Sequence, residues 1–307
     1  MIPEKYIEII KSGGVVAFPT ETVYGLGADA WNPTAIQKVF ETKGRPSDNP
    51  LIVHISDLQQ VSDFVEEIPE LAQLLMNTFW PGPLTLVLKK KPAVLDAISA
   101  GLNSVAIRMP SHPLAIEFIS RTGPLVAPSA NTSGKPSPTK AKHVFSDFGD
   151  SVPIIDGGST EVGLESTVLD LTSSIPTILR PGFISKEEIE QVIKQPVNIT
   201  TKAIASPKSP GQKYSHYKPK AAVYWLDDKS ELTNQNTLYL LQDAELKQSN
   251  IITYKGDLAL MAKEIYDRFR QADVDGFHQI LIEPLHKYTT HPLHSALQNR
   301  IDKAVEK

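Results

Sequence analysis

The chain has 307 residues, no cysteine and a formal net charge of −4. The lack of cysteine excludes disulfides, a thiolate nucleophile and cysteine-ligated metal sites, and the acidic balance disfavours indiscriminate nucleic-acid binding. No run of about 18 apolar residues is present, which excludes a membrane-spanning helix, and acids interrupt the apolar N-terminal run, unlike a signal peptide. We therefore expect a cytoplasmic protein of about two domains.

Residues 1–200 alternate between apolar runs typical of buried strands and segments with helical periodicity. An asparagine cap at Asn32, a serine cap at Ser111 and a capping box formed by Ser185 and Glu188 mark three helix starts. This alternation predicts a layered α/β domain over residues 1–200. Its strands are expected at residues 15–18, 51–55, 84–88, 105–109, 125–127, 167–171 and 177–179.

The composition changes at residues 201–220, which hold three prolines and no long apolar stretch. Such a composition is typical of a linker, although this one is unusually rich in aromatic and basic residues. Residues 221–307 return to α/β patterning, with a helix capped by Asp257 and a last helix marked by Leu297. They predict a second, smaller α/β domain. Its strands are expected at residues 223–226, 237–241 and 279–282.

Cations, hydroxyls and amides gather at the predicted strand ends, where ligands bind in open α/β sheets. The residues concerned are Thr22, Arg45, Asn49, His54, Arg108, Ser129, Asn131, Ser166 and Arg180. Lys43 adds a second cation beside Arg45, and such a pair could hold phosphate oxygens. We find neither a Ser–His–Asp order nor paired carboxylates. The pattern therefore predicts an anion-binding cleft that acts by proximity and charge stabilisation, without a protein nucleophile.

Several multi-residue motifs follow one another in a characteristic order. They are PTETVYGLG at 19–27, KGR at 43–45, NPL at 49–51, WPGPLT at 80–85, RMP at 108–110, SAN at 129–131 and GLEST at 163–167. Together they resemble the YrdC family, the threonylcarbamoyl-AMP synthases. The segment SPGQKYSHYKP at 209–219 is similar to the linker of the family's long form, in which Gln212 often has an apolar counterpart.

The resemblance implies a twisted mixed β-sheet domain of YrdC type (1–200), a linker (201–220) and a smaller Rossmann-like α/β domain (221–307). The implied enzyme is a nucleotidyltransferase that converts L-threonine, bicarbonate and ATP into threonylcarbamoyl-AMP and pyrophosphate. Its product would serve the t⁶A modification of tRNA, made by a separate transferase complex. Mg²⁺ is expected to enter with ATP, with no metal ligand from the protein, and no strong direct tRNA binding is expected.

The resemblance also implies roles for individual residues. Threonine would be bound by Thr22, His54, Arg108 and Ser166. The nucleotide would be bound by Lys43, Arg45, Asn49, Ser104, Ser129, Asn131, Ser137, Arg180 and Tyr217. Lys43 and Arg45 would act directly on the reaction, and Tyr217 would fold over the nucleotide as part of a lid that excludes water.

Two other functions fit parts of the sequence. The cationic cleft could instead belong to an RNA-binding module without enzymatic activity. GLGADA at residues 25–30 loosely fits a dinucleotide fingerprint, but the next helix begins too late, at Asn32, for a nicotinamide site. His286, His291 and His294 cluster near the end of the chain without a nearby carboxylate, so packed or solvated histidines are expected there rather than a metal site.

Overall fold

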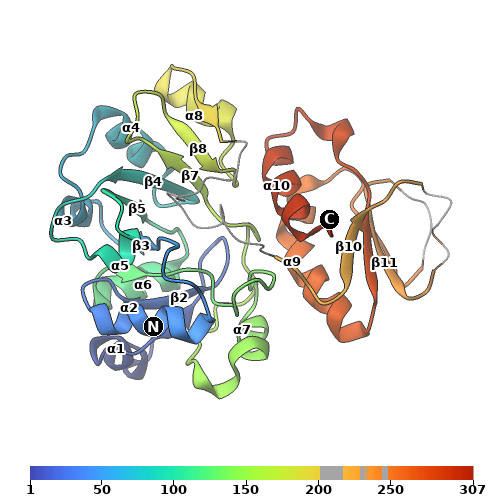
Figure 1. Ribbon diagram of the computed structural model, residues 1–307, viewed down its shortest axis with the longest axis horizontal. Coiled ribbons are helices and arrows are strands. Elements are labelled where there is room, and N and C mark those ends of the chain that lie inside the picture. The colour runs from blue at the N-terminus through green and yellow to red at the C-terminus, as the bar shows by residue number, and fades with distance from the viewer. Residues whose placement is uncertain (201–216, 229–231, 233, 244–247, 307) are drawn as a thin grey trace.

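The structure is a computed structural model that describes residues 1–200, 217–228, 232, 234–243 and 248–306. It contains two sheets, one of nine strands and one of four. We call the part built on the nine-stranded sheet the first domain and the part built on the four-stranded sheet the second domain (Figure 1). The predicted boundaries at residues 200 and 220 stay a prediction, because residues 201–216 lie outside the described ones.

The first domain carries eight α-helices and nine strands within the described residues. The helices are α1 (Glu4–Lys11), α2 (Pro33–Lys43), α3 (Val61–Phe64), α4 (Glu70–Phe79), α5 (Asp96–Ser99), α6 (Pro113–Thr122), α7 (Ala141–Phe148) and α8 (Lys186–Ile193). The strands are β1 (Val16–Phe18), β2 (Gly25–Asp29), β3 (Ile52–His54), β4 (Leu84–Lys89), β5 (Ser104–Arg108), β6 (Leu125–Val126), β7 (Thr167–Asp170), β8 (Thr177–Arg180) and β9 (Asn198–Ile199).

The nine-stranded sheet is mixed, with the order β1-β2-β6-β3-β5-β4-β7-β8-β9. In the middle of the sheet β3 pairs with β5 in parallel, and His54 stands opposite Arg108 in the register. β4 pairs with β7 in parallel, and β7 pairs with β8 so that Val168 is opposite Arg180. The register therefore brings the carboxyl ends of β3 and β5 side by side, with a histidine and an arginine as their last residues.

Among the described residues, the second domain has an all-parallel sheet with the order β10-β13-β11-β12 and two α-helices that pack against it. Its elements are β10 (Ala222–Trp225), β11 (Thr237–Leu241), β12 (Ile251–Thr253), α9 (Leu258–Asp275), β13 (Gln279–Ile282) and α10 (His294–Ala304). In Figure 1, α9 and α10 lie between this sheet and the first domain. The mixed sheet and the second, smaller α/β sheet confirm the predicted fold class. No helix among the described residues is long and apolar enough to cross a membrane.

Local signals placed most helix starts correctly. The Asn32 side chain accepts hydrogen bonds from Thr34 N and Ala35 N, and the Ser185–Glu188 capping box is formed. The Ser111 cap was wrong: His112 caps α6, because its Nδ1 accepts from Leu114 N at 3.2 Å.

The GLGADA segment does not form a phosphate-binding turn. Gly25–Asp29 is itself strand β2, antiparallel to β1, and it packs against Phe18. A Cβ at Gly27 would lie 2.9 Å from Phe18 Cε1, so the glycine permits close packing of β2 on this ring. The strand therefore removes the basis for the nicotinamide hypothesis.

Candidate active site

A cavity opens where the polar motifs of the first domain meet. Most of its wall comes from the ends of strands and from the loops that follow them. It is lined by Thr20, Thr22, Val23, Gly25, Lys43, Arg45, Ile52, His54, Arg108, Ala127, Pro128, Ser129, Asn131, Ser133, Gly134, Lys135, Ser137, Glu165, Ser166, Arg180 and Tyr217. Cations outnumber carboxylates in this wall, so the cavity has the electrostatic character of an anion site.

Most of the predicted site residues share this cavity, and two do not. Those in its wall are Thr22, Lys43, Arg45, His54, Arg108, Ser129, Asn131, Ser137, Ser166, Arg180 and Tyr217. Asn49 is buried beneath Arg45, whose Nη2 donates to the Asn49 carbonyl at 3.1 Å. Ser104 begins β5, opposite Lys89, at the far end of the strand from Arg108. The structure does not bring Ser104 to the cavity.

Arg108 is the cation at the end of β5, and only 4% of its side chain is exposed. Its Nη2 lies 2.6 Å from the Glu21 carboxylate, its Nη1 donates to Thr22 Oγ1 at 2.8 Å, and its Nε donates to the Gly82 carbonyl at 3.2 Å. A guanidinium has five N–H donors. The three contacts therefore fix the orientation of the group and leave donors for a carboxylate in the cavity.

Ser166 precedes β7 and is held by two neighbours. Its Oγ lies 2.7 Å from Thr85 Oγ1 and accepts a hydrogen bond from Arg180 Nη2 at 3.0 Å. Arg180 Nε also donates to the Ser166 carbonyl at 3.1 Å. The end of β8 thus fixes a serine hydroxyl in the cavity wall.

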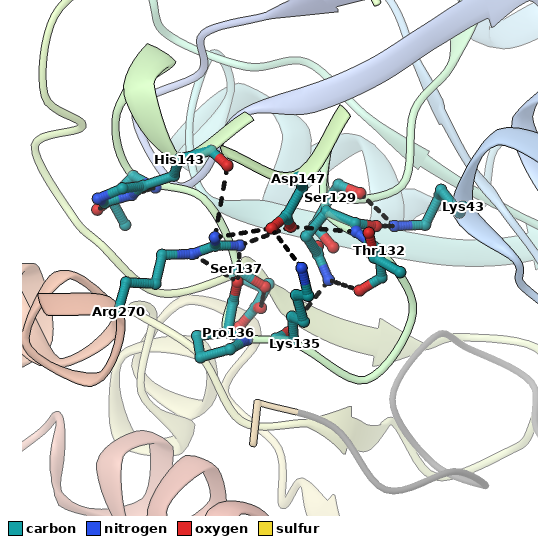
Figure 2. A network of polar contacts seen from close by, with 12 residues as sticks. Lys43, Ser129, Thr132, Lys135, Pro136, Ser137, His143, Asp147 and Arg270 are labelled. Atoms are coloured by element: carbon teal, nitrogen blue, oxygen red, sulfur yellow. Dashed lines mark hydrogen bonds and ion pairs between the residues drawn. The ribbon is translucent and has the colours of Figure 1, made fainter. Parts of the chain in front are cut away.

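Lys43 ends α2 and is almost completely buried. Its Nζ donates to the carbonyls of Ser129 and Asn131 at 2.5 and 2.6 Å. Figure 2 shows the Lys43 side chain directed toward Ser129. Burial and the charge of Arg45 lower the pKa of Lys43 well below its usual value. Among the described residues no carboxylate pairs with Lys43, so an anionic ligand would stabilise its charged form.

His54 ends β3 beside Arg108 and is also buried. Its Nδ1 lies 3.2 Å from the Ile52 carbonyl, which can only accept a hydrogen bond, so Nδ1 carries the proton. Burial and the charge of Arg108 lower the pKa of His54 to about 3. The ring is therefore neutral near pH 7, and its Nε2 is an acceptor.

Sequence reasoning missed three polar residues of this region. Glu21 pairs with Arg108, Thr85 contacts Ser166, and Glu165 lies in the cavity wall. All three lie inside motifs that were recognised, but motif position does not reveal which side chain meets which. The available signal was an acidic residue directly beside a predicted site residue, as Glu21 is beside Thr22 and Glu165 is beside Ser166.

A protein-held Mg²⁺ does not fit this cavity. Glu165 is the sole acid among the described residues that line it, and the Glu165 carboxylate already accepts hydrogen bonds from Ser137, Tyr266 and Arg300. Mg²⁺ prefers carboxylate, phosphate and water oxygens in octahedral geometry. The cations and hydroxyls of this wall suit phosphate oxygens instead.

Two family models match the chain. The model described as "Telomere recombination", of the Sua5/YciO/YrdC family, matches residues 8–182. The model described as "Threonylcarbamoyl-AMP synthase, C-terminal domain" matches residues 184–305. The two matches together cover both sheets.

Curated proteins and solved structures are similar to the chain over long stretches. The threonylcarbamoyl-AMP synthases of Bacillus subtilis and Pyrococcus abyssi are 55% and 52% identical over 222 and 220 residues. Each alignment covers 70% of this chain and 64% of the relative, which is less than two thirds of the relative's length. The crystal structure of P. abyssi Sua5 complexed with L-threonine superposes with a TM-score of 0.89 at 41% identity, covering 99% of this chain and 95% of that one. The chain belongs to the Sua5/YciO/YrdC family, in the form that carries the Sua5 C-terminal domain.

Proposed function

We propose that the protein is a threonylcarbamoyl-AMP synthase. The reaction would consume L-threonine, bicarbonate and ATP and release threonylcarbamoyl-AMP and pyrophosphate. The observation that carries the proposal is one cavity holding an oriented arginine, Arg108, together with the cations Lys43, Arg45 and Arg180. Such a wall suits an amino-acid carboxylate and a polyphosphate bound side by side, and the names of the curated relatives support the same reaction.

The chemistry has two steps that these residues can assist. The neutral amine of threonine attacks bicarbonate, which forms a carbamate and releases water. A carbamate oxygen then attacks the α-phosphorus of ATP, and the bond to the pyrophosphate oxygen breaks. Since the carbamate and the triphosphate repel each other, cations are needed to bring them into line and to stabilise the departing charge.

We assign the two substrates to different parts of the wall. Threonine would be bound by Thr22, His54, Arg108 and Ser166. The nucleotide would be bound by Lys43, Arg45, Ser129, Asn131, Ser137, Arg180 and Tyr217, with Asn49 supporting Arg45. We leave Ser104 out because it stands at the other end of β5. Neutral His54 can accept a hydrogen bond from the threonine amine or hydroxyl through Nε2.

The remaining parts of the proposal concern partners and location. Mg²⁺ would arrive on the triphosphate, held by phosphate oxygens and water. The product would pass to a tRNA threonylcarbamoyl transferase complex for t⁶A modification, without strong direct tRNA binding by this chain, and the protein would act in the cytoplasm. Any lid formed by residues 201–216 falls outside the described residues.

Pyrophosphate release is the direct test. The purified chain with ATP, Mg²⁺, bicarbonate and L-threonine, but no tRNA, should release pyrophosphate, and omission of threonine or bicarbonate should stop net synthesis. Failure to form threonylcarbamoyl-AMP under these conditions, combined with tight salt-sensitive binding of RNA, would favour an RNA-binding module instead.

A further inference from the structure

Arg270 reaches from α9 of the second domain to the loop that we assign to the nucleotide. Its Nε and Nη2 donate to the Pro136 carbonyl at 3.1 and 2.6 Å. Its Nη1 and Nη2 also lie 3.1 and 2.9 Å from the two oxygens of Asp147 on α7, and 10% of the arginine side chain and 1% of the aspartate side chain are exposed. Figure 2 shows this contact directly beside the loop. One buried bidentate pair therefore joins the second domain to the first.

Asp147 connects this arginine to the rest of the loop. Its carboxylate accepts from Thr132 N at 3.2 Å and from Lys135 Nζ at 3.0 Å. Burial alone would raise the pKa of Asp147, but hydrogen bonds and charges from Arg270 and Lys135 outweigh it and lower the pKa. The aspartate is therefore charged at neutral pH and holds the loop at two points.

The same loop is held from its other side by Lys43, through the carbonyls of Ser129 and Asn131. Asn131 Nδ2 closes the turn by donating to the carbonyls of Thr132 and Lys135 at 2.8 and 3.1 Å. Asn131 Oδ1 is buried and accepts no hydrogen bond from the described residues. The loop thus presents an unsatisfied acceptor between two fixed ends, as a ligand-binding loop would.

A second arginine, Arg300, acts indirectly on Ser137, the loop residue that follows Pro136. Arg300 of α10 has no exposed surface, and its Nε donates to Glu165 Oε2 at 2.8 Å. Tyr266 of α9 donates to the same oxygen at 3.0 Å, while Ser137 donates to Glu165 Oε1 at 2.5 Å. Through Glu165, the second domain therefore orients the Ser137 hydroxyl, which directly follows Pro136.

Close packing around Glu165 leaves little freedom for the two domains to slide. Gly163 has φ +79°, and a Cβ there would lie 2.4 Å from Lys263 Cα and 2.5 Å from the Ala262 carbonyl of α9. Leu164 is fully buried and joins the apolar core of the second domain. The backbone of the GLEST motif is thus seated on α9, which lets a contact from α10 fix side-chain positions in the cavity.

We propose that the second domain completes the nucleotide site, with Arg270 and Arg300 as positioning residues that fix the loop at residues 129–137. The inference rests on the proposed function, because it takes ATP as the ligand of this loop. A loop ordered before ATP arrives avoids the ordering cost that a free loop would bear on binding. The second domain thereby contributes to ATP affinity without touching ATP through either arginine.

The test compares ATP and threonine binding in the full chain by calorimetry. Arg270→Met and Arg300→Met should each weaken binding of Mg–ATP by roughly tenfold. Arg270→Met should leave threonine affinity within about twofold, since Arg270 contacts Pro136 of the nucleotide loop and His143 and Asp147 of α7, none of which is assigned to threonine. Arg268→Met is the matched control, because Arg268 lies on the same helix and its guanidinium donates to Glu264, also on α9. It should bind both ligands as the wild type does.

Hydrogen exchange separates positioning from general damage. Amides of residues 131–137 should exchange faster in Arg270→Met than in Arg268→Met, while the sheet amides of both stay protected. Arg270→Lys keeps the positive charge at this position and should recover part of the ATP affinity that Arg270→Met loses. Unchanged ATP affinity and exchange in Arg270→Met and Arg270→Lys would overturn the inference. Equal loss of ATP and threonine binding would also overturn it, whereas failure of the wild type to bind ATP would overturn the proposed function itself.

Discussion

Replacing Arg108 by alanine should affect stability and substrate binding by separable amounts. Arg108 and Glu21 form an ion pair at 2.6 Å with 4% of each side chain exposed. The two Glu21 carboxylate oxygens accept no hydrogen bond from other described residues. Removal of one partner leaves a buried unpaired charge, which costs about 3–5 kcal/mol. We expect Arg108→Ala to lower the free energy of unfolding by that amount.

Threonine binding should fall by a further and independent amount. Loss of charge-assisted hydrogen bonds to a carboxylate costs about 1.5–3 kcal/mol, which weakens threonine binding by roughly 10- to 150-fold. ATP affinity should change much less, because its assigned cations stay in place. The double variant Glu21→Gln/Arg108→Met removes both charges and should recover most of the stability but none of the threonine affinity.

Urea unfolding gives the first quantity and calorimetric titration with threonine and with ATP gives the second. Threonine affinity unchanged in Arg108→Ala would show that another group binds the carboxylate. A double variant no more stable than Arg108→Ala would show that the buried Glu21 charge is not the source of the instability. Each result refutes a different step of the reasoning.

Three further predictions concern the cavity. Lys43→Met should weaken ATP binding by at least roughly tenfold with little effect on threonine, because it removes a charge-assisted donor from the nucleotide side; equal effects on both ligands in calorimetry would contradict the assignment. Burial alone would raise the pKa of Glu165, but the charges of Arg300 and Arg180 outweigh burial and lower this pKa to about 2. The ionised Glu165 therefore stabilises the folded state above its unfolded pKa of 4.5, and this contribution is lost as the pH falls toward 2. Glu165→Gln should therefore lower the free energy of unfolding at pH 6 by about 3 kcal/mol. In urea titrations, the free energy of unfolding of this variant should also decrease less between pH 5 and pH 3 than that of the wild type, and an equal decrease would argue against the depressed pKa. His54 should show no protonation between pH 8 and pH 5 when its ring protons are followed by NMR, since burial and Arg108 lower its pKa to about 3, and a midpoint near pH 6 would contradict a neutral acceptor.

Local signals in the sequence were sufficient for much of the first domain. Helix caps such as Asn32 and the Ser185–Glu188 box act within one turn, so three or four residues contain the information. The strand-end residues were also accessible, because adjacent carboxyl ends meet at one edge: His54 and Arg108 are opposite each other in register. Ser104 was assigned through the resemblance alone, and it begins β5, so it lies at the opposite end of that strand from Arg108.

The remaining elements and contacts could not be predicted from the sequence, because they depend on pairing between residues that are far apart in the chain. β2 is missing from the strands predicted from the sequence, because its strand character depends on β1 and β6, and the β6 partners Val126 and Leu125 are about a hundred residues away. The Arg300–Glu165 contact spans 135 residues. Neither end of such a contact carries a local pattern that identifies the other.

The second domain explains how a charged Glu165 can stand in the wall of a cationic cavity. An unpaired carboxylate in the cavity wall would weaken the attraction of Lys43, Arg45 and Arg180 for anions. Arg300 contacts Glu165 but is not itself one of the residues that line the cavity. Its positive charge offsets the Glu165 carboxylate, so the cavity cations still attract anions. The carboxylate can then orient Ser137 and Tyr266 without repelling a phosphate. An arginine in the second domain therefore permits a negatively charged side chain to order the anion site that we propose in the first.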